Sequence, residues 1–585
     1  MRFSKMSAYF PVQYISRTEG SFTGGTIRKN IMPENHGGAF TIEIEPDQCR
    51  ITADRSGVFY AEDVLKEFDG KVPCGVIREK PAMAVRCFHI DMKKGIGSLN
   101  ELKKTVLRLR ELRINYILAE YENRIRYSCA PEIAASDALT RDEVREFVRF
   151  AEDNGIQVIP LLQCLGHMEY LLSFEKYRHL RESPDNVTQY CPLNEGSLEL
   201  FLRMAEELLE LHPNSEYFHV GGDETRQLGK CPKCAGFVSR HGVHELFFQR
   251  LNAVCSWFDR HGRKTLFWHD MLGRAKRFDL IGKLPETAFP MYWNYQGDDD
   301  VYARYHLEGT EGFTISEKWM DKVHSYADFE AVPKSFVNVK PDLPLKNTLF
   351  DGLEELCRVR HEVWGASATS LAGLLPNELP VRENIANWCR SAAKFGLKGI
   401  VITCWAASDS HSVACGPRSL HHYCIAIEGM KLWDPSLTME EIRERYDASY
   451  GCRGLSRILD IMVFSKPREQ FCNWGEYGGA LMEGLKPTAH LDLFEKYYAA
   501  VQADKLFHIA DSVIRRRGKV MFTSIEPARA AARERFRKMR ERLLESRAEL
   551  EKIFADEYPP DALKEWLDSL YMPKLIQVDG YIHYK

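Results

Sequence analysis

Residues 217–225 have the sequence Tyr-Phe-His-Val-Gly-Gly-Asp-Glu-Thr, and this stretch decides which fold and which chemistry the chain predicts. Its apolar first half is typical of a buried strand, and two glycines separate that strand from the adjacent carboxylates Asp223 and Glu224. Burying two carboxylates costs desolvation energy and moves their pKa values apart, which favours acid–base catalysis. The alternative is an ordinary helix N-terminus, where Asp and Glu complement the helix dipole.

The predicted strand in this stretch is one of eight short apolar segments that alternate with amphipathic helical patterns. Most of the eight are continuously apolar, as strands buried on both faces are. Alternating strands and helices predict parallel β–α units, and eight units predict a TIM barrel, with a doubly wound sheet as the alternative. The predicted strands are 85–91, 115–121, 156–162, 216–222, 265–271, 288–293, 361–367 and 399–405.

In a TIM barrel the active-site residues lie at the carboxyl ends of the strands. Here seven of the eight predicted strands end in ionisable, amide or aromatic residues, which predicts one pocket lined by carboxylates and tryptophans. In chain order these residues are Lys93 and Lys94, Glu120 and Glu122, Gln163 and His167, Asp223 and Glu224, Trp268 and Asp270, Trp293 and Tyr295, and Trp405 and Asp409.

The segments on either side of the barrel have different patterns. Residues 40–45 alternate between apolar and polar side chains like a half-buried strand, and a helical pattern follows at 61–68. The predicted fold class is therefore α/β: a small α+β domain over residues 1–80, a (β/α)8 barrel over 81–435, and an α-helical region over 436–585. The alternating Arg and Glu residues of 529–554 predict a solvated helix, and a homodimer contact is the alternative.

Composition limits the classes of partner. The chain has 585 residues, 44% of them hydrophobic and 28% charged, with a formal net charge of -4, so nothing favours nucleic acid or an anionic membrane. No apolar segment approaches the roughly 18 residues of a membrane helix, and the first residues lack the layout of a signal peptide. We therefore expect a cytoplasmic location and no membrane partner.

The 16 cysteines are scattered, and several lie in apolar runs, which is typical of buried reduced thiols and not of a disulfide framework. Cys231-Pro-Lys-Cys234 has the spacing of half a zinc knuckle, but no second pair at metal-ligand spacing accompanies it. The sequence alone leaves open whether this pair binds metal.

Tryptophans at three predicted strand ends, Trp268, Trp293 and Trp405, suit a sugar, because pyranose C–H faces pack on aromatic rings. Glycoside hydrolysis normally uses two carboxyl groups about 5–10 Å apart that flank the scissile bond. The adjacent Asp223 and Glu224 are poorly placed to act on opposite faces. One of them is expected to protonate the leaving oxygen, and a substrate with its own nucleophile, such as a 2-acetamido group, makes a second attacking carboxylate unnecessary.

The segment 219–224 resembles the active-site motif of glycoside hydrolase family 20, the β-N-acetylhexosaminidases, and within it the hexosaminidase D group. The N-terminal segment 40–73 resembles the small domain that precedes the barrel in this family, whereas the resemblance does not extend to the C-terminal 150 residues. Further matching segments lie in order at 85–93, 120–122, 158–169, 266–272, 364–368 and 399–405.

This resemblance implies an exo-acting, retaining, substrate-assisted hydrolase of terminal N-acetylhexosamines that requires no cofactor and no metal. Glu224 is implied to be the general acid and later the base, and Asp223 to orient the acetamido group. The implied substrate-binding residues are His167 beside the acid, Trp268, Trp293 and Trp405 around the acetamide and the ring, Tyr295 at the acetamide oxygen, Asp409 at the outer hydroxyls, and Lys93, Glu120, Glu122 and Asp270.

The chain departs from the family pattern at several strand ends. Lys94 stands where many members have a sugar-clamping arginine, and the hexosaminidase D pattern points to Lys93 instead. Asn123 and Gln163 each stand where relatives have an aspartate. The choice between gluco- and galacto-configured sugars therefore stays open, although the likeness to hexosaminidase D makes N-acetylgalactosamine the first expectation.

Two other functions remain as alternatives. A sugar-binding barrel without catalysis would use the same tryptophans and carboxylates, although binding alone does not need an adjacent carboxyl pair. A two-carboxylate glycosidase would combine Glu224 with Glu122 or Asp270, and would act on sugars that lack the acetamido group.

Overall fold

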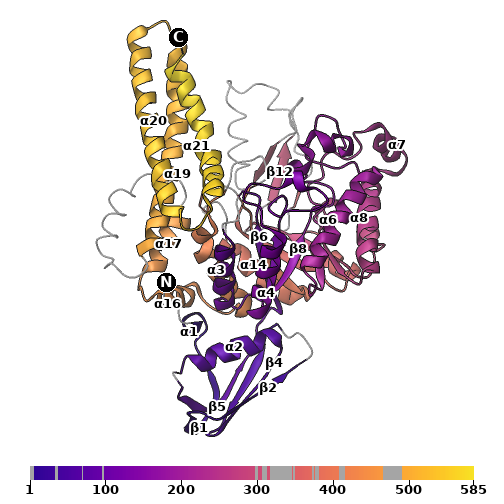
Figure 1. The fold of residues 1–585 in the computed structure, drawn as a ribbon, viewed down its shortest axis with the longest axis vertical. Helices are drawn as coiled ribbons and strands as arrows, with labels where there is room; N and C mark the ends of the chain where they lie inside the picture. The colour runs from indigo at the N-terminus through magenta and orange to yellow at the C-terminus, as the bar shows by residue number, and fades with distance from the viewer. Residues whose placement is uncertain are drawn as a thin grey trace.

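Eight parallel strands form a closed barrel at the centre of the molecule (Figure 1). The computed structural model describes residues 6–32, 37–68, 70–94, 98–296, 301–305, 313–316, 345–346, 350–371, 374–375, 381–407, 415–464 and 491–584. Each of the eight predicted strands is present, and pairing of the last strand with the first closes the barrel. The strands are β6 (Val85–Asp91), β7 (Tyr116–Glu120), β8 (Gln157–Leu161), β9 (Tyr217–His219), β10 (Lys264–Trp268), β11 (Ala288–Trp293), β15 (Trp364–Ser370) and β16 (Gly399–Cys404).

The continuous apolar runs form strands because both faces of each strand are buried. In β6, Val85 and Cys87 point into the barrel and join its inner cluster, whereas Phe88 and Ile90 pack in the layer beneath the helices. The helices on the outside are α3 (Leu99–Glu111), α4 (Arg141–Asp153), α6 (Glu195–Leu211), α8 (Val243–Arg260), α14 (Val381–Phe395) and α15 (His422–Trp433). The barrel interior is therefore a packed core, and residues available for binding or catalysis are expected at the carboxyl ends of the strands.

Two strands end earlier than their apolar runs predict. The strand predicted at 216–222 stops at His219, because Gly221 and Gly222 turn the chain with φ of +63° and +92°. The strand predicted at 265–271 stops at Trp268, and the short helix α9 (Asp270–Gly273) follows. After these early ends, Asp223 and Glu224 follow in a turn and Asp270 begins α9, so that their side chains converge above the barrel.

The N-terminal domain is a five-stranded sheet with the order β1-β5-β3-β4-β2, and the helix α2 (Arg55–Lys66) packs against it. Its strands are β1 (Tyr14–Phe22), β2 (Thr26–Ile31), β3 (Phe40–Ile44), β4 (Gln48–Ala53) and β5 (Val72–Glu79), with the short helix α1 (Met6–Tyr9) before them. Arg113 of the barrel ion-pairs with Glu79 of this sheet and stacks 4.3 Å from the ring centroid of Trp433. The domain is thus anchored at the end of the barrel away from the active-site rim.

Smaller elements lie in the loops of the barrel. A three-stranded sheet of β12 (Val301–Tyr305), β13 (Phe313–Ser316) and β14 (Leu345–Lys346) interrupts the β–α alternation between β11 and β15 and was not predicted. The short helices are η1 (Pro131–Ile133), α5 (Glu169–Leu172), η2 (Glu175–Leu180), α7 (Pro232–His241), α10 (Phe278–Ile281), α13 (Leu353–Val359), η5 (Arg418–His421) and η6 (Lys519–Phe522).

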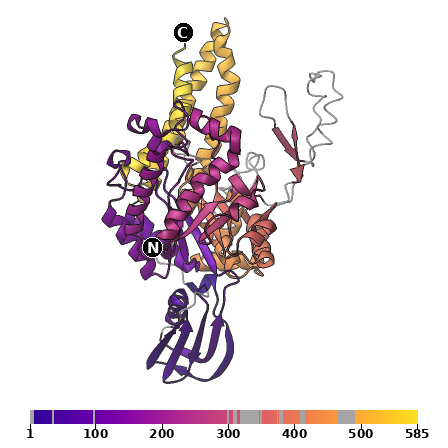
Figure 2. The same cartoon turned by 90° about the vertical axis from the view of Figure 1, so that its right-hand side faces the viewer.

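The C-terminal region is helical, and its last three helices run side by side away from the barrel, opposite the N-terminal sheet (Figures 1 and 2). Its helices are α16 (Met439–Tyr450), α17 (Leu455–Phe464), α19 (Leu491–Gly518), α20 (Glu526–Phe554) and α21 (Pro560–Ile582). α20 buries Leu543 and Leu550 within the bundle, whereas Leu544 is 40% exposed because neighbouring helical residues point in different directions. Among the residues described, no helix combines the length and the apolar character needed to cross a membrane.

Candidate active site

Three residues at the carboxyl-end rim of the barrel have an unusual backbone. Glu122, His167 and Glu224 adopt φ of +44°, +53° and +49°, in the left-handed region that side chains other than glycine rarely occupy. Each costs about 1–3 kcal/mol, and such strain concentrates at functional sites. All three are residues that the sequence predicts for the site.

The glycine pair before the carboxylates is required by close packing. A Cβ on Gly221 would lie 1.8 Å from Oε1 of Gln163, so no side chain fits there. The same Oε1 accepts a hydrogen bond from the backbone N–H of Gly222 at 3.1 Å. Gln163 therefore holds the turn that carries Asp223 and Glu224.

Asp223 is buried and held from two sides. Nε2 of Gln163 lies 3.2 Å from its Oδ1, and Nε2 of His167 lies 3.4 Å from its Oδ2. Burial opposes ionisation of Asp223, but the positive His167 ring outweighs it and lowers the pKa of the carboxyl overall. Burial also disfavours charge on His167, yet Asp223 raises the pKa of that ring to about 10. The pair is therefore an aspartate anion beside an imidazolium cation at neutral pH.

Glu224 is adjacent in sequence but has different surroundings. Its side chain is 40% exposed, whereas that of Asp223 is 11% exposed. Its Oε2 lies 4.0 Å from Nε2 of His167, and its Oε1 accepts a hydrogen bond from the exposed Arg226 at 2.9 Å. The sequence places His167 beside the acid, and the structure places this ring between the two carboxylates, closer to Asp223.

Asp270 lies behind the turn. Its Oδ2 accepts a hydrogen bond from the backbone N–H of Glu224 at 3.1 Å, and its Oδ1 accepts one from the indole of Trp293 at 3.3 Å. Burial and the charge of Asp223 raise the pKa of Asp270 to about 6. Both oxygens are thus occupied in orienting the backbone of Glu224 and one tryptophan.

Four aromatic residues line the rim next to the carboxylates. The rings of Trp293 and Tyr295 stack with centroids 5.3 Å apart, and the indole N–H of Trp405 donates to Oη of Tyr295 at 3.2 Å. Trp268 is only 1% exposed and lies 6.0 Å from Trp405 between ring centroids. Trp268 therefore forms the floor, whereas Trp293, Tyr295 and Trp405 are partly accessible and form the side.

Lys93 lies in a buried network and is already in contact with protein carboxylates. Its Nζ is 3.0 Å from Glu120, 3.3 Å from Asp91 and 3.7 Å from Glu122. Burial opposes its charge, but these carboxylates together raise its pKa well above the ordinary value. The network joins the ends of β6, β7 and β16, because Asp91 also accepts a hydrogen bond from the backbone N–H of Ala406 at 2.9 Å.

Three further residues contact the predicted site residues: Gln163, which the sequence places at a strand end without a substrate-binding role, and Asp91 and His89, which were not predicted for the site. Gln163 lies two residues after β8 and donates a hydrogen bond to Asp223, so its place at the strand end is what indicated it. Asp91 is the last residue of β6 and could have been found in the same way. Nε2 of His89 donates a hydrogen bond to the Glu120 carboxylate at 3.0 Å, but His89 lies within an apolar strand and gives no sign of this in the sequence. Asp409, which the sequence predicts for the outer hydroxyls, lies outside the described residues.

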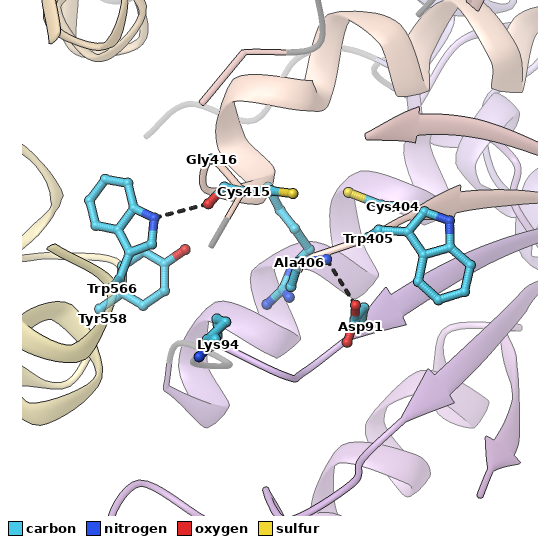
Figure 3. Close-up of a pocket in the computed structure, with 10 residues that line it drawn as sticks. Asp91, Lys94, Cys404, Trp405, Ala406, Cys415, Gly416, Tyr558 and Trp566 are labelled. Atoms are coloured by element: carbon cyan, nitrogen blue, oxygen red, sulfur yellow. Dashed lines mark hydrogen bonds between the residues drawn. The ribbon is translucent and has the colours of Figure 1, made fainter. Parts of the chain in front are cut away.

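The C-terminal helix α21 reaches the same rim (Figure 3). The indole N–H of Trp566 donates to the carbonyl of Cys415 at 2.9 Å, and Trp566 lines a small cavity together with Asp91 and Trp405. Glu565 accepts hydrogen bonds from Arg124 at 3.0–3.1 Å. The helical region therefore braces the barrel next to the candidate site.

Comparisons with known proteins find similarity to one family. The model of the glycosyl hydrolase family 20 catalytic domain matches residues 118–313, which include Asp223 and Glu224. Hexosaminidase D of Bos taurus is 28% identical over 343 residues, covering 57% of this chain and 87% of the relative. Hexosaminidase D of Homo sapiens is 24% identical over 520 residues, covering 85% of this chain and 93% of the relative.

Solved structures agree on the fold. A chitobiase from Flavobacterium johnsoniae is 14% identical with a TM-score of 0.54, covering 99% of this chain and 94% of its own. A β-N-acetylhexosaminidase from Bacteroides fragilis is 16% identical with a TM-score of 0.52, covering 77% and 94%. The family expected from the sequence is thus found by sequence comparison, and the barrel architecture by structure comparison.

Proposed function

The chain is a glycoside hydrolase with a family 20 catalytic domain, and from this premise we propose that it removes terminal N-acetylhexosamines with retention, by substrate-assisted catalysis. In this proposal the 2-acetamido oxygen of the substrate attacks the anomeric carbon. Asp223 orients the acetamido N–H and stabilises the oxazolinium charge. Glu224 protonates the leaving oxygen and later deprotonates the attacking water.

The observation that carries the proposal is the difference between the two adjacent carboxyl groups. Asp223 is buried and kept ionised by His167, as a residue that stabilises positive charge must be. Glu224 is half-exposed, as a residue that exchanges protons with a leaving group and water must be. When two neighbouring carboxyl groups have different surroundings, one can act as the acid while the other stays ionised and stabilises positive charge.

The other carboxylates near the site, as far as the structure describes it, already have partners in the protein. Asp91, Glu120 and Glu122 surround Lys93, and Asp270 accepts hydrogen bonds from Glu224 and Trp293. A two-carboxylate mechanism would require one of them to leave these partners and attack the sugar. This arrangement supports a nucleophile that comes from the substrate.

The test is a pair of variants assayed on N-acetylhexosaminides. For Glu224→Gln we expect a loss of about 10²–10⁴-fold in kcat on substrates with poor leaving groups, with KM nearly unchanged. For Asp223→Asn we expect a comparable loss that is specific to N-acetyl sugars. Arg226→Gln is the matched control, because its 75% exposed side chain contacts Glu224 but has no assigned role.

Full activity of Glu224→Gln would contradict the assignment of the acid. Wild-type activity on non-acetylated sugars, together with indifference to thiazoline inhibitors, would instead support the two-carboxylate alternative. Comparing gluco- and galacto-configured N-acetyl substrates in the same assay determines the sugar configuration.

We also propose a reducing compartment such as the cytoplasm. The support is that Cys87, Cys164 and Cys404 are buried free thiols within barrel strands or their ends. Fractionation of the source cells with an antibody against the chain tests the location, and recovery outside the cytoplasm would reject it.

A further inference from the structure

A second cluster of chemical groups lies outside the candidate active site. Glu182, Cys191, Cys231 and Cys234 place one oxygen and three sulfurs within 4.8 Å of one another. Sγ of Cys191 is 3.5 Å from Sγ of Cys234 and 3.7 Å from Sγ of Cys231. Ligands about 2.3 Å from a tetrahedral zinc ion lie about 3.8 Å apart, so the sulfur atoms already have nearly that spacing.

The local structure around the CxxC pair has the form of a metal knuckle. Cys231 is the N-cap of α7, and its Sγ accepts a hydrogen bond from the backbone N–H of Cys234 at 3.3 Å. Pro232 follows at the first helical position, which fixes the turn between the two sulfurs. The third sulfur and the carboxylate come from the loop between β8 and α6, where the bridge between Arg181 and Tyr190 folds the chain back on itself.

The buried carboxylate of Glu182 is an independent indication of a cation site. It is 1% exposed, and its Oε1 accepts hydrogen bonds from the backbone N–H groups of Lys230 at 2.7 Å and Cys231 at 3.1 Å. Its Oε2 is buried without a hydrogen-bond partner in the described structure. An unpartnered buried carboxylate oxygen is costly, and a metal ion bound to it would remove that cost.

The hydrogen bonds of two cationic side chains in this region go to acceptors other than Glu182. Arg250 donates its hydrogen bonds to the carbonyls of Cys191, Pro192 and Asn194, and to Ser197. The ammonium of Lys233 donates to the carbonyl of Leu193 at 2.8 Å. Both side chains hold the loop backbone in place and leave the sulfur atoms facing one another.

We propose that Cys191, Cys231, Cys234 and Oε2 of Glu182 bind one zinc ion in a closed tetrahedral site. Three thiolates and one carboxylate fill all four positions, so the site has no open position for substrate and is structural. Each cysteine that binds as a thiolate releases its proton to solvent. Iron in the same tetrahedral setting would reject zinc as the bound metal, and metal analysis distinguishes the two.

The position of the ion gives it an effect on the rim without a part in the reaction. It would join the loop after β8, which carries His167, to the loop after β9, which carries Asp223 and Glu224. The two loops are already linked by the backbone N–H of Gln227, which donates to Gln189 at 2.9 Å. The ion would clamp these loops beside the turn that holds both carboxylates.

The first measurement is the metal content of the full-length protein, purified without chelator, by inductively coupled plasma mass spectrometry. We expect one zinc per chain, released when the thiols are modified and detected with a chromogenic zinc indicator. Cobalt substitution should give the thiolate-to-metal charge-transfer absorption of a tetrahedral sulfur site. These measurements do not depend on the sugar chemistry, so failure of the zinc proposal can be distinguished from failure of the proposed function.

Variants identify the ligands. Cys231→Ser should lose zinc, whereas Cys357→Ser, the same change at another half-buried cysteine far along the chain, should retain it. Glu182→Gln keeps an oxygen that can accept both backbone hydrogen bonds but removes the anion, and should lower zinc affinity in competition with the indicator. Zinc-free wild type should melt at a lower temperature and regain its melting temperature when zinc is added.

Three results would overturn the proposal. One is wild-type protein that contains no zinc and binds none when zinc is added. Another is a Cys191–Cys234 disulfide, detected by mass spectrometry without reduction. The third is Cys231→Ser protein that retains one zinc per chain.

Discussion

Replacement of His167 by Asn tests most directly whether this histidine keeps Asp223 ionised. In the wild type, Nε2 of His167 is 3.4 Å from Oδ2 of Asp223, and the two groups are oppositely charged. At an effective dielectric constant of about 20, Coulomb attraction over this distance is about 5 kcal/mol before the desolvation of both groups is subtracted. Asparagine keeps a polar side chain of similar reach but removes the positive charge.

Without that charge, Asp223 remains buried near Glu120 and Asp270, whose negative charges favour its protonated form. We expect its pKa to rise by about 1–3 units, the usual effect of a neighbouring opposite charge. The acid limb of the pH profile of kcat/KM should move upward by a similar amount. Activity lost at low pH should therefore be recovered in large part at higher pH.

The assay is kcat/KM on one N-acetylhexosaminide across about pH 4–9, where the essential acid and base of the free enzyme titrate. The control is Arg226→Gln, which removes an exposed partner of Glu224 worth at most about 1 kcal/mol and should not move the acid limb. A uniform rate loss in His167→Asn with the acid limb unmoved would refute the argument that His167 acts by keeping Asp223 ionised.

Three further changes have defined outcomes. Lys93→Met leaves Asp91, Glu120 and Glu122 without their shared cation, so it should lower the free energy of unfolding by about 3–5 kcal/mol in urea titrations, and Lys93→Arg should recover part of this loss. Glu224→Gly should abolish turnover. It should also raise the free energy of unfolding by about 1–2 kcal/mol relative to Glu224→Gln, because glycine adopts φ of +49° without strain. Equal free energies of unfolding for the two variants would contradict this. Folding raises the pKa of His167 from 6.5 to about 10. The contribution of the protonated ring to stability is therefore complete below pH 6.5 and disappears as the pH rises towards 10. Over that window the melting temperature should fall more in wild type than in His167→Asn.

Much of the barrel could be predicted because its strands are uninterrupted apolar runs, and such runs can be recognised whatever loops connect them. Their exact ends could not be predicted, since a glycine pair at 221–222 and a short helix at 270–273 end β9 and β10 through backbone conformation. The sheet of β12, β13 and β14 was missed because it interrupts the repeating β–α order.

The candidate site shows the same division. Asp223, Glu224 and the tryptophans were predictable from their places at strand ends. The contacts of Lys93 were not, because they depend on distances between three separate strands and their loops. The sequence singled out Cys231 and Cys234 but not the third sulfur, because Cys191 lies 40 residues before Cys231 in sequence although their sulfur atoms are 3.7 Å apart in space.

Docking of α21 on the barrel rim has a consequence for biosynthesis. Arg124 and Cys415 meet Glu565 and Trp566, which the ribosome adds long after it has completed the eighth strand. At about 5–20 residues per second, roughly 8–30 s separate the synthesis of residue 404 from that of residue 560. All eight barrel strands of a nascent chain therefore exist for many seconds before the helix that covers this edge is made, and chaperones that bind exposed surface have that interval in which to act.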